Sequence, residues 1–199
     1  MSKSQLKTIS IIKNRMAEMA SIDRYKFELT VCLSVGIIFG CITQALYGSK
    51  SEWAGLPEGY CTGFLSAFLA VAPVTLGYTA GIFACAPFSI ARMLIYPGAA
   101  IRGMGLGALF CGAMQCGSLR EMCFDAIVML PYAAANCVLA VYAGEYALGL
   151  KESFTSENEG LTGSLVLHTI KMLSFYLAVA ALSCVAFAAS CLLFGKYLI

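Results

Sequence analysis

Charged residues are scarce in this sequence, since Asp, Glu, Lys and Arg make up only 12% of its 199 residues. A soluble domain carries about 25% charged residues and about 45–50% apolar ones. Here 60% of the residues are hydrophobic and the mean hydropathy is +0.81. The net charge is only +2 and no long basic run occurs, so nothing indicates a nucleic-acid partner. The composition excludes a soluble fold and favours the lipid bilayer.

Residues that hold metals or carry out catalysis are also few. The chain has one histidine, and its ten cysteines form no Cys-x-x-Cys pair. Nearly all of these cysteines fall inside apolar runs, where they are expected to act as small core residues. The sequence contains no Gly-x-Ser-x-Gly, His-Glu-x-x-His or P-loop motif. We therefore expect no catalytic residue, no metal and no cofactor, and a role other than that of an enzyme.

Long apolar segments are what the sequence has in abundance. They predict an all-α, polytopic membrane bundle of about five transmembrane helices in one domain, residues 27–199. The expected spans are residues 27–47, 61–83, 102–116, 122–148 and 165–195. Pro73 is expected to kink or break the second span. Residues 84–101 are expected to form an interfacial helix or a re-entrant segment, with a turn at Pro97-Gly98.

The segment before the first span, residues 1–26, is basic and amphipathic. Its apolar residues recur at helical spacing and its other side carries lysine and arginine, a pattern that suits a helix lying in the membrane interface or packed on its own protein. With five spans, most Lys and Arg residues share the side of the N-terminus. Basic loops stay in the cytoplasm, so we expect a cytoplasmic N-terminus in a multi-pass protein of the cell membrane.

Two ionisable residues at membrane depth are the main candidates for a site. Arg102 and Glu145 are expected at similar depth on antiparallel helices, as a charge pair that lines a polar pocket or acts as a structural clamp. Arg102 alone could instead extend toward the lipid headgroups. Asp125 carries less weight, because its spacing from Arg120 allows only an exposed and weak local pair. His168 carries less weight because it has no partner at helical spacing.

Glycines four residues apart predict close helix packing. Gly36 and Gly40 lie in the first span, and Gly103 and Gly107 lie in the third. Such small-residue faces allow two backbones to approach, either within one chain or between the copies of a homo-oligomer.

The middle of the chain resembles a family of bacterial membrane proteins. An apolar stretch at residues 88–96 precedes Arg102-Gly103-Met104-Gly105-Leu106-Gly107, and a short glycine-bounded loop follows at residues 112–117. Met129-Leu130-Pro131 and the run at residues 133–136 complete the pattern. This order, from Gly81 to Gly149 or about a third of the chain, resembles the stage II sporulation protein M family.

The resemblance implies five spans, a cytoplasmic N-terminus and a scaffold without enzymatic activity. Members of that family hold peptidoglycan-degrading enzymes at the membrane while the mother cell engulfs the forespore. The resemblance implies membrane-associated cell-wall hydrolases as partners and offers no catalytic residues. It assigns Arg102, Gly103, Gly107 and Pro131 as structural or partner-contact positions.

A transporter subunit is the alternative function. The substrate-binding component of an energy-coupling-factor transporter has a similar size and hydrophobicity, although six spans are usual there. It needs a deep polar pocket, to which Gln44, Tyr78, Tyr132 and Asn136 could contribute. Interrupted helices at Pro73, Pro97 and Pro131 would fit such a site.

Overall fold

The computed structural model describes residues 3–47, 63–88, 90–115, 119–156 and 162–198. Within these ranges it describes the side chains of residues 24–47, 63–88, 90–112, 114–115, 119, 122–124, 126–150 and 166–194. The predicted outer loops, the Asp125 side chain and the side chains of the basic segment before Arg24 lie outside this description.

Five long helices form the molecule, and the described residues contain no strand. They are α1 (Lys3–Tyr47), α2 (Phe64–Cys85), α3 (Ala91–Met114), α4 (Leu119–Ser156) and α5 (Thr162–Leu198). Each helix contains a stretch of at least 22 residues that is apolar enough to cross a bilayer. About 20 residues span the hydrocarbon core, so the predicted five-span membrane bundle is confirmed.

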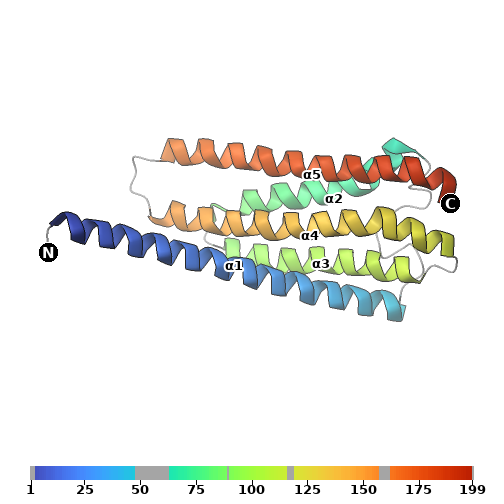
Figure 1. Ribbon diagram of the computed structural model, residues 1–199, viewed down its shortest axis with the longest axis horizontal. Coiled ribbons are helices and arrows are strands. Elements are labelled where there is room, and N and C mark those ends of the chain that lie inside the picture. Colours follow the sequence, from blue (N-terminus) through green and yellow to red (C-terminus); the bar gives the residue numbers. More distant parts are fainter. Residues whose placement is uncertain (1–2, 48–62, 89, 116–118, 157–161, 199) are drawn as a thin grey trace.

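The five helices alternate in direction and lie side by side (Figure 1). The pair α1 and α3 and the pair α2 and α5 pack on opposite sides of α4, which contacts all four other helices. With an odd number of crossings, the N-terminal end of α1 and the C-terminal end of α5 lie at opposite ends of the bundle. We call these the N-terminal end and the C-terminal end of the bundle.

The third helix differs from its predicted boundaries. It begins at Ala91 rather than near Arg102, and it continues through Pro97, so the predicted turn at Pro97-Gly98 is wrong. The reversal of the chain instead follows α2, where Phe88 N–H donates to Cys85 O and Ala91 N–H donates to Phe88 O. Hydrocarbon offers no hydrogen bonds to an open backbone, so apolar segments stay helical even when proline removes one bond.

The predicted segment 1–26 and the first span are one continuous helix. α1 contains 45 residues, of which Arg24–Tyr47 form the membrane-crossing part. In Figure 1 the N-terminal part of α1 extends beyond the bundle along the direction of the helix. Pro73 likewise lies inside an unbroken α2, so the second span is not interrupted.

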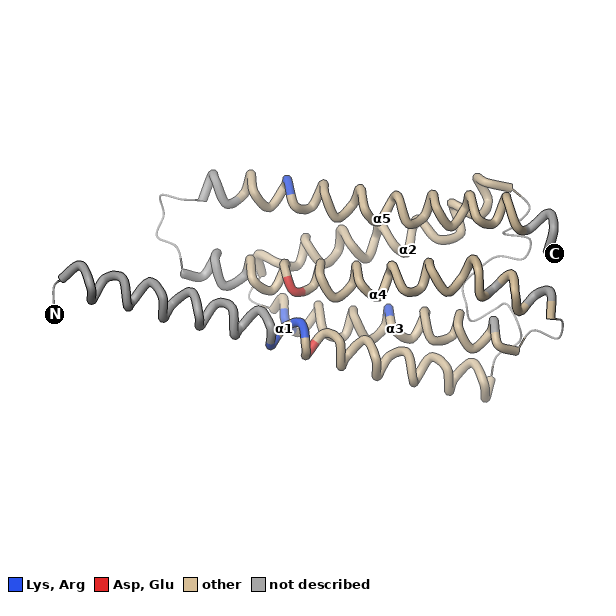
Figure 2. Tube along the Cα trace, viewed as in Figure 1, with Lys and Arg blue, Asp and Glu red and all other residues tan. Residues whose placement is uncertain are grey.

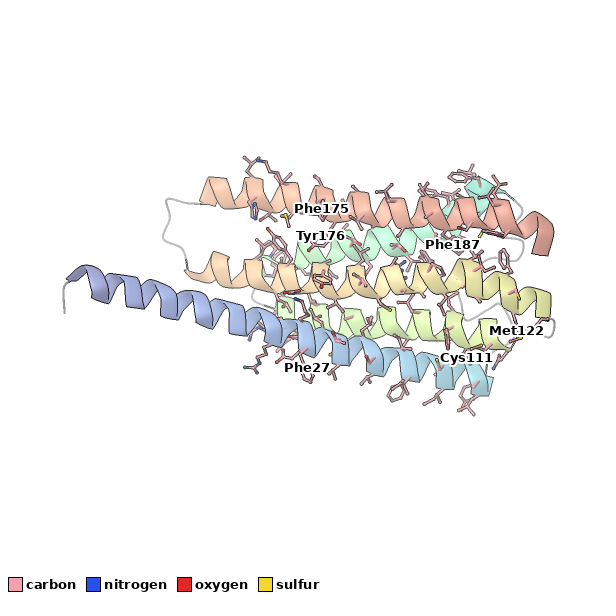
Figure 3. The ribbon with its side chains drawn as sticks, viewed as in Figure 1. Phe27, Cys111, Met122, Phe175, Tyr176 and Phe187 are labelled. Atoms are coloured by element: carbon pink, nitrogen blue, oxygen red, sulfur yellow. The ribbon has the colours of Figure 1, made fainter. Side chains whose placement is uncertain are left out.

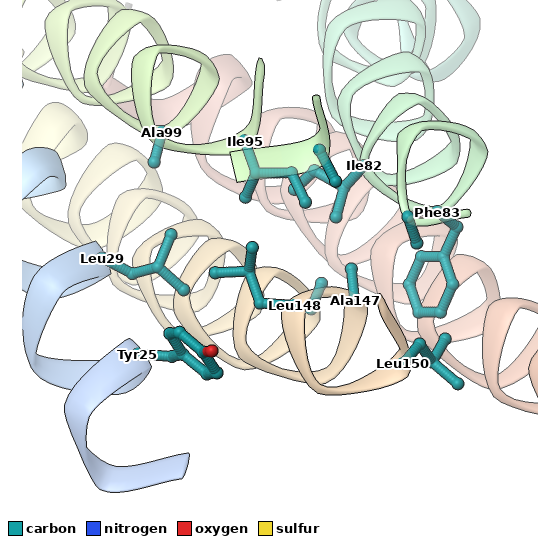
Figure 4. Close-up of a cluster of buried hydrophobic side chains, with 12 residues drawn as sticks. Tyr25, Leu29, Ile82, Phe83, Ile95, Ala99, Ala147, Leu148 and Leu150 are labelled. Carbon is teal, nitrogen blue, oxygen red and sulfur yellow. The ribbon is translucent and has the colours of Figure 1, made fainter. Parts of the chain in front are cut away.

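Apolar side chains fill two hydrophobic clusters along the bundle. The first lies toward the N-terminal end and joins α1, α2, α3 and α4, with Leu29, Ile95 and Leu148 almost completely buried (Figure 4). The second joins α2, α4 and α5 toward the other end, where the ring centroids of Tyr132 and Phe187 lie 4.8 Å apart. Many large apolar side chains outside these clusters point outward, as Phe27 does on α1 (Figure 3).

Backbone contact holds α1 against α3. A Cβ added to Gly36 would lie 2.1 Å from Ala100 O, and one added to Gly107 would lie 2.1 Å from Ile37 O. Gly40 and Gly103 are equally close to the opposite helix. The predicted glycine packing therefore occurs within the chain, between α1 and α3, at these four positions.

We predict that Gly107→Ala destabilises the fold by about 1–3 kcal/mol, because its methyl group meets a carbonyl oxygen that no side-chain rotation can move. Gly81→Ala is the matched control, since a Cβ there meets nothing within 4 Å. Equilibrium unfolding of the purified protein in mixed micelles measures both. Equal stability of the two variants would contradict a close α1–α3 contact.

A candidate polar site at the centre of the bundle

Arg102 lies near the middle of the membrane-crossing part of α3, Ala91–Gly112. Because α3 begins at Ala91, Arg102 stands about 16 Å along the helix, about half the thickness of the hydrocarbon core. Its side chain is only 8% exposed. Figure 2 shows the other described charges gathered toward the N-terminal end, with one basic residue alone farther along α3. This residue is Arg102, so a cation is buried at mid-membrane depth.

Three polar side chains surround the guanidinium. Arg102 Nη2 lies 2.9 Å from Thr75 Oγ1 on α2, 2.5 Å from Asn136 Oδ1 on α4 and 3.4 Å from Tyr132 OH on α4. Thr75 Oγ1 and Tyr132 OH are themselves hydrogen-bonded at 2.7 Å. We call these four residues the Arg102 cluster. It links α2, α3 and α4 through hydrogen bonds at a depth where water cannot replace them.

Helix packing explains why the Arg102 cluster forms. Thr75 on α2 and Asn136 on α4 stand between the residues of the two hydrophobic clusters, and Tyr132 belongs to the second of them. Asn136 also uses its amide to donate to Tyr132 O, one turn back on its own helix, at 2.9 Å. That bond fixes the amide so that its oxygen faces Arg102. The Asn136 acceptor is thus oriented toward Arg102 by a hydrogen bond within its own helix.

The predicted ion pair between Arg102 and Glu145 is wrong. Glu145 Oε1 instead lies 3.3 Å from Lys26 Nζ, toward the N-terminal end of the bundle. The sequence-based pairing assumed that α3 starts at Arg102 and so placed this residue too close to that end. The earlier start at Ala91 moves Arg102 to mid-depth, several turns from Glu145.

Charges at the N-terminal end form a separate network around α1. Glu28 accepts a hydrogen bond from Arg24 at 2.8 Å and another from the Tyr96 hydroxyl. Arg92 donates to the Tyr25 hydroxyl. Lys26 also lies 5.0 Å from the centre of the Tyr142 ring. Apart from the buried Tyr25, these side chains are partly or fully exposed, so each pair adds little stability and the group is best seen as a polar belt at the membrane surface.

Other residues considered from the sequence lie elsewhere or stand alone. Gln44 is buried, but its amide nitrogen lies 3.7 Å from the Cβ position of Gly112, at the C-terminal end. His168 is exposed, and its ring centroid lies 6.1 Å from that of Tyr146. Pro131 has an exposed side chain inside α4. Within the described part of the chain, no three His, Cys, Asp or Glu side chains gather as metal ligands would.

Sequence reasoning missed Thr75 as part of the site. A usable signal was present, because Thr75, Tyr78 and Thr79 put three hydroxyl groups on one face of an otherwise apolar helix. Tyr132 and Asn136, one turn apart on α4, repeat this signal. Polar residues at helical spacing inside a span indicate a buried partner.

Comparison with known proteins finds no match to this chain among family models, curated proteins or solved structures.

We predict that Thr75→Val lowers the free energy of unfolding by about 1–2 kcal/mol, since it removes an acceptor from a buried cation. Thr79→Val is the matched control. Thr79 is equally buried, but its hydroxyl only donates to Thr75 O in its own helix. Unfolding measured in mixed micelles should separate the two variants. A Thr75→Val protein as stable as the control would mean that the Arg102 cluster does not hold the helices together.

Proposed function

We propose that the protein is a non-enzymatic scaffold of the cell membrane that anchors peptidoglycan-remodelling enzymes, as the resemblance to the stage II sporulation protein M family implies. The main support is that residues marked by the resemblance form contacts between helices. Arg102 bonds to α2 and α4, and Gly103 and Gly107 contact the α1 backbone. Three of the four positions that the resemblance marks thus join helices to one another. A rigid body that presents apolar helix faces to the membrane suits an anchoring role.

The proposed orientation puts the N-terminal end in the cytoplasm. The basic residues Arg24, Lys26, Arg92 and Lys171 lie toward this end with only two acidic side chains, Glu28 and Glu145, among the described residues (Figure 2). The excess of Lys and Arg at this end favours a cytoplasmic position. The helix ends at Tyr47, Phe64, Met114 and Leu119 then face outward, toward the cell wall. Partners with domains outside the membrane would meet the scaffold there.

A transporter subunit of the energy-coupling-factor type is the second candidate. One observation favours it: Arg102 places a cation in the middle of the bundle, and its hydrogen-bonding partners among the described residues, Thr75, Tyr132 and Asn136, are all neutral. Buried ionisable groups in membranes commonly mark a substrate or ion pathway.

Photo-crosslinking in native membranes tests the scaffold proposal. A crosslinking residue replaces Tyr47 or Leu119, which are 75% and 78% exposed toward the C-terminal end, and Met93, 78% exposed toward the other end, serves as control. Partners are identified by mass spectrometry. We expect a cell-wall hydrolase with a domain outside the membrane, captured more strongly from Tyr47 and Leu119 than from Met93. Capture of an ATPase and a transmembrane coupling subunit would reject the scaffold and favour the transporter.

A further inference from the structure

Arg102 has more hydrogen-bond donors than the Arg102 cluster uses. A guanidinium has five N–H groups, and all three contacts of Arg102 involve the single atom Nη2. Arg102 has no other partner within the described part of the chain, so Nε and Nη1 donate no hydrogen bond there. Arg102 is nearly buried as a residue, but these unpaired nitrogens are not among the fully buried polar atoms of the described residues, so they stay accessible to a ligand. The Arg102 cluster therefore leaves both a positive charge and three N–H groups unmatched.

A second buried polar group near Arg102 is also unmatched. The Tyr78 hydroxyl is buried and has no hydrogen-bond partner among the described residues. Tyr78 lies one turn from Thr75 on the same face of α2, and its hydroxyl is within electrostatic range of Arg102. Natural structures leave few buried polar atoms unsatisfied, and such atoms need an explanation. Two independent donors thus lie in one region with no acceptor for either.

The face of α3 beside Arg102 is lined by glycine. Gly98 and Gly105 stand four residues before and three residues after Arg102, so they share its side of the helix. The Cβ position of Gly98 meets only the Tyr78 ring, at 3.7 Å, and that of Gly105 meets nothing within 4 Å. The missing side chains leave open space on this face of α3 at Gly105, within one turn of Arg102. We call this place the Gly105 recess.

We propose that Arg102, Tyr78 and the Gly105 recess bind a small organic monocarboxylate. One negative charge balances Arg102, whereas a dianion such as phosphate would leave an unpaired charge at mid-membrane depth. A carboxylate has two oxygen atoms, which can accept from the free guanidinium N–H groups and from the Tyr78 hydroxyl. The ring of Tyr78 and the glycine backbone suit an apolar body behind the carboxylate. This site does not depend on the scaffold proposal, because binding concerns only the interior of the bundle.

Binding to the purified full chain in detergent micelles tests this site. The probes are sodium acetate, butyrate and benzoate, each compared with its neutral amide, and the measurement is the shift of the thermal unfolding midpoint with concentration. We expect at least one carboxylate to raise the midpoint saturably while its amide does not. If no carboxylate gives a saturable shift beyond that of its amide and of sodium chloride, the proposal is wrong.

Variants locate the binding. Arg102→Gln should weaken binding of the active carboxylate about tenfold or more, because a charged hydrogen bond is lost. Tyr78→Phe should weaken it about fivefold. Tyr78 makes no hydrogen bond within the part of the chain that the structure describes, so this change breaks none there and the variant is expected to stay folded. Tyr47→Phe at an exposed position is the matched control and should change nothing.

Filling the recess gives a test that leaves every charge in place. Gly105→Leu should abolish binding, whereas Gly149→Leu, where a Cβ also meets nothing within 4 Å, should leave it unchanged. If Tyr78→Phe and Gly105→Leu both bind the carboxylate as the unaltered chain does, the ligand lies elsewhere and the assignment is overturned.

Discussion

A polar group inside a bilayer has only the protein to bond to, and this constraint governs the whole bundle. Hydrocarbon offers neither hydrogen bonds nor a dielectric that screens charge. Arg102 is the residue on which the constraint acts most strongly, because it lies at mid-depth and is nearly buried. Thr75 and Asn136 meet part of its demand, and in doing so they fix α2 and α4 relative to α3. The hydrophobic clusters on either side of Arg102 then pack with the helices in a fixed alignment.

The same constraint accounts for the two kinds of contact in the bundle. Lipid tails are as apolar as leucine, so apolar side chains gain little by moving from lipid to a neighbouring helix. Specific association must come from close backbone approach or from hydrogen bonds. The α1–α3 pair uses the first, through Gly36, Gly40, Gly103 and Gly107. The contacts of α3 with α2 and α4 use the second, through the Arg102 cluster.

Local patterns of residue type were enough to predict five spans and close packing at the glycines, but not that α1 and α3 are the helices that meet there. The start of α3 was not predictable in this way. Pro97-Gly98 is a turn signal in water, but the bilayer penalises an open backbone enough to keep the helix intact. The start of α3 also determines which residues form the site, because it sets the depth of Arg102 and hence the side chains that Arg102 can reach. Thr75 and Asn136 could be suspected as buried polar residues, yet their meeting with Arg102 depends on the rotation of three helices, which no local pattern records.

The glycine contact between α1 and α3 has a consequence for how the sequence can change over time. At each of the four positions the obstacle to a larger residue is the backbone of the opposite helix, which every amino acid possesses. A substitution on the facing helix therefore cannot make room, as it can in a core where side chains meet side chains. A larger residue at one of these glycines cannot be compensated by a smaller residue on the opposite helix. Such a substitution is accommodated only if α1 and α3 move apart.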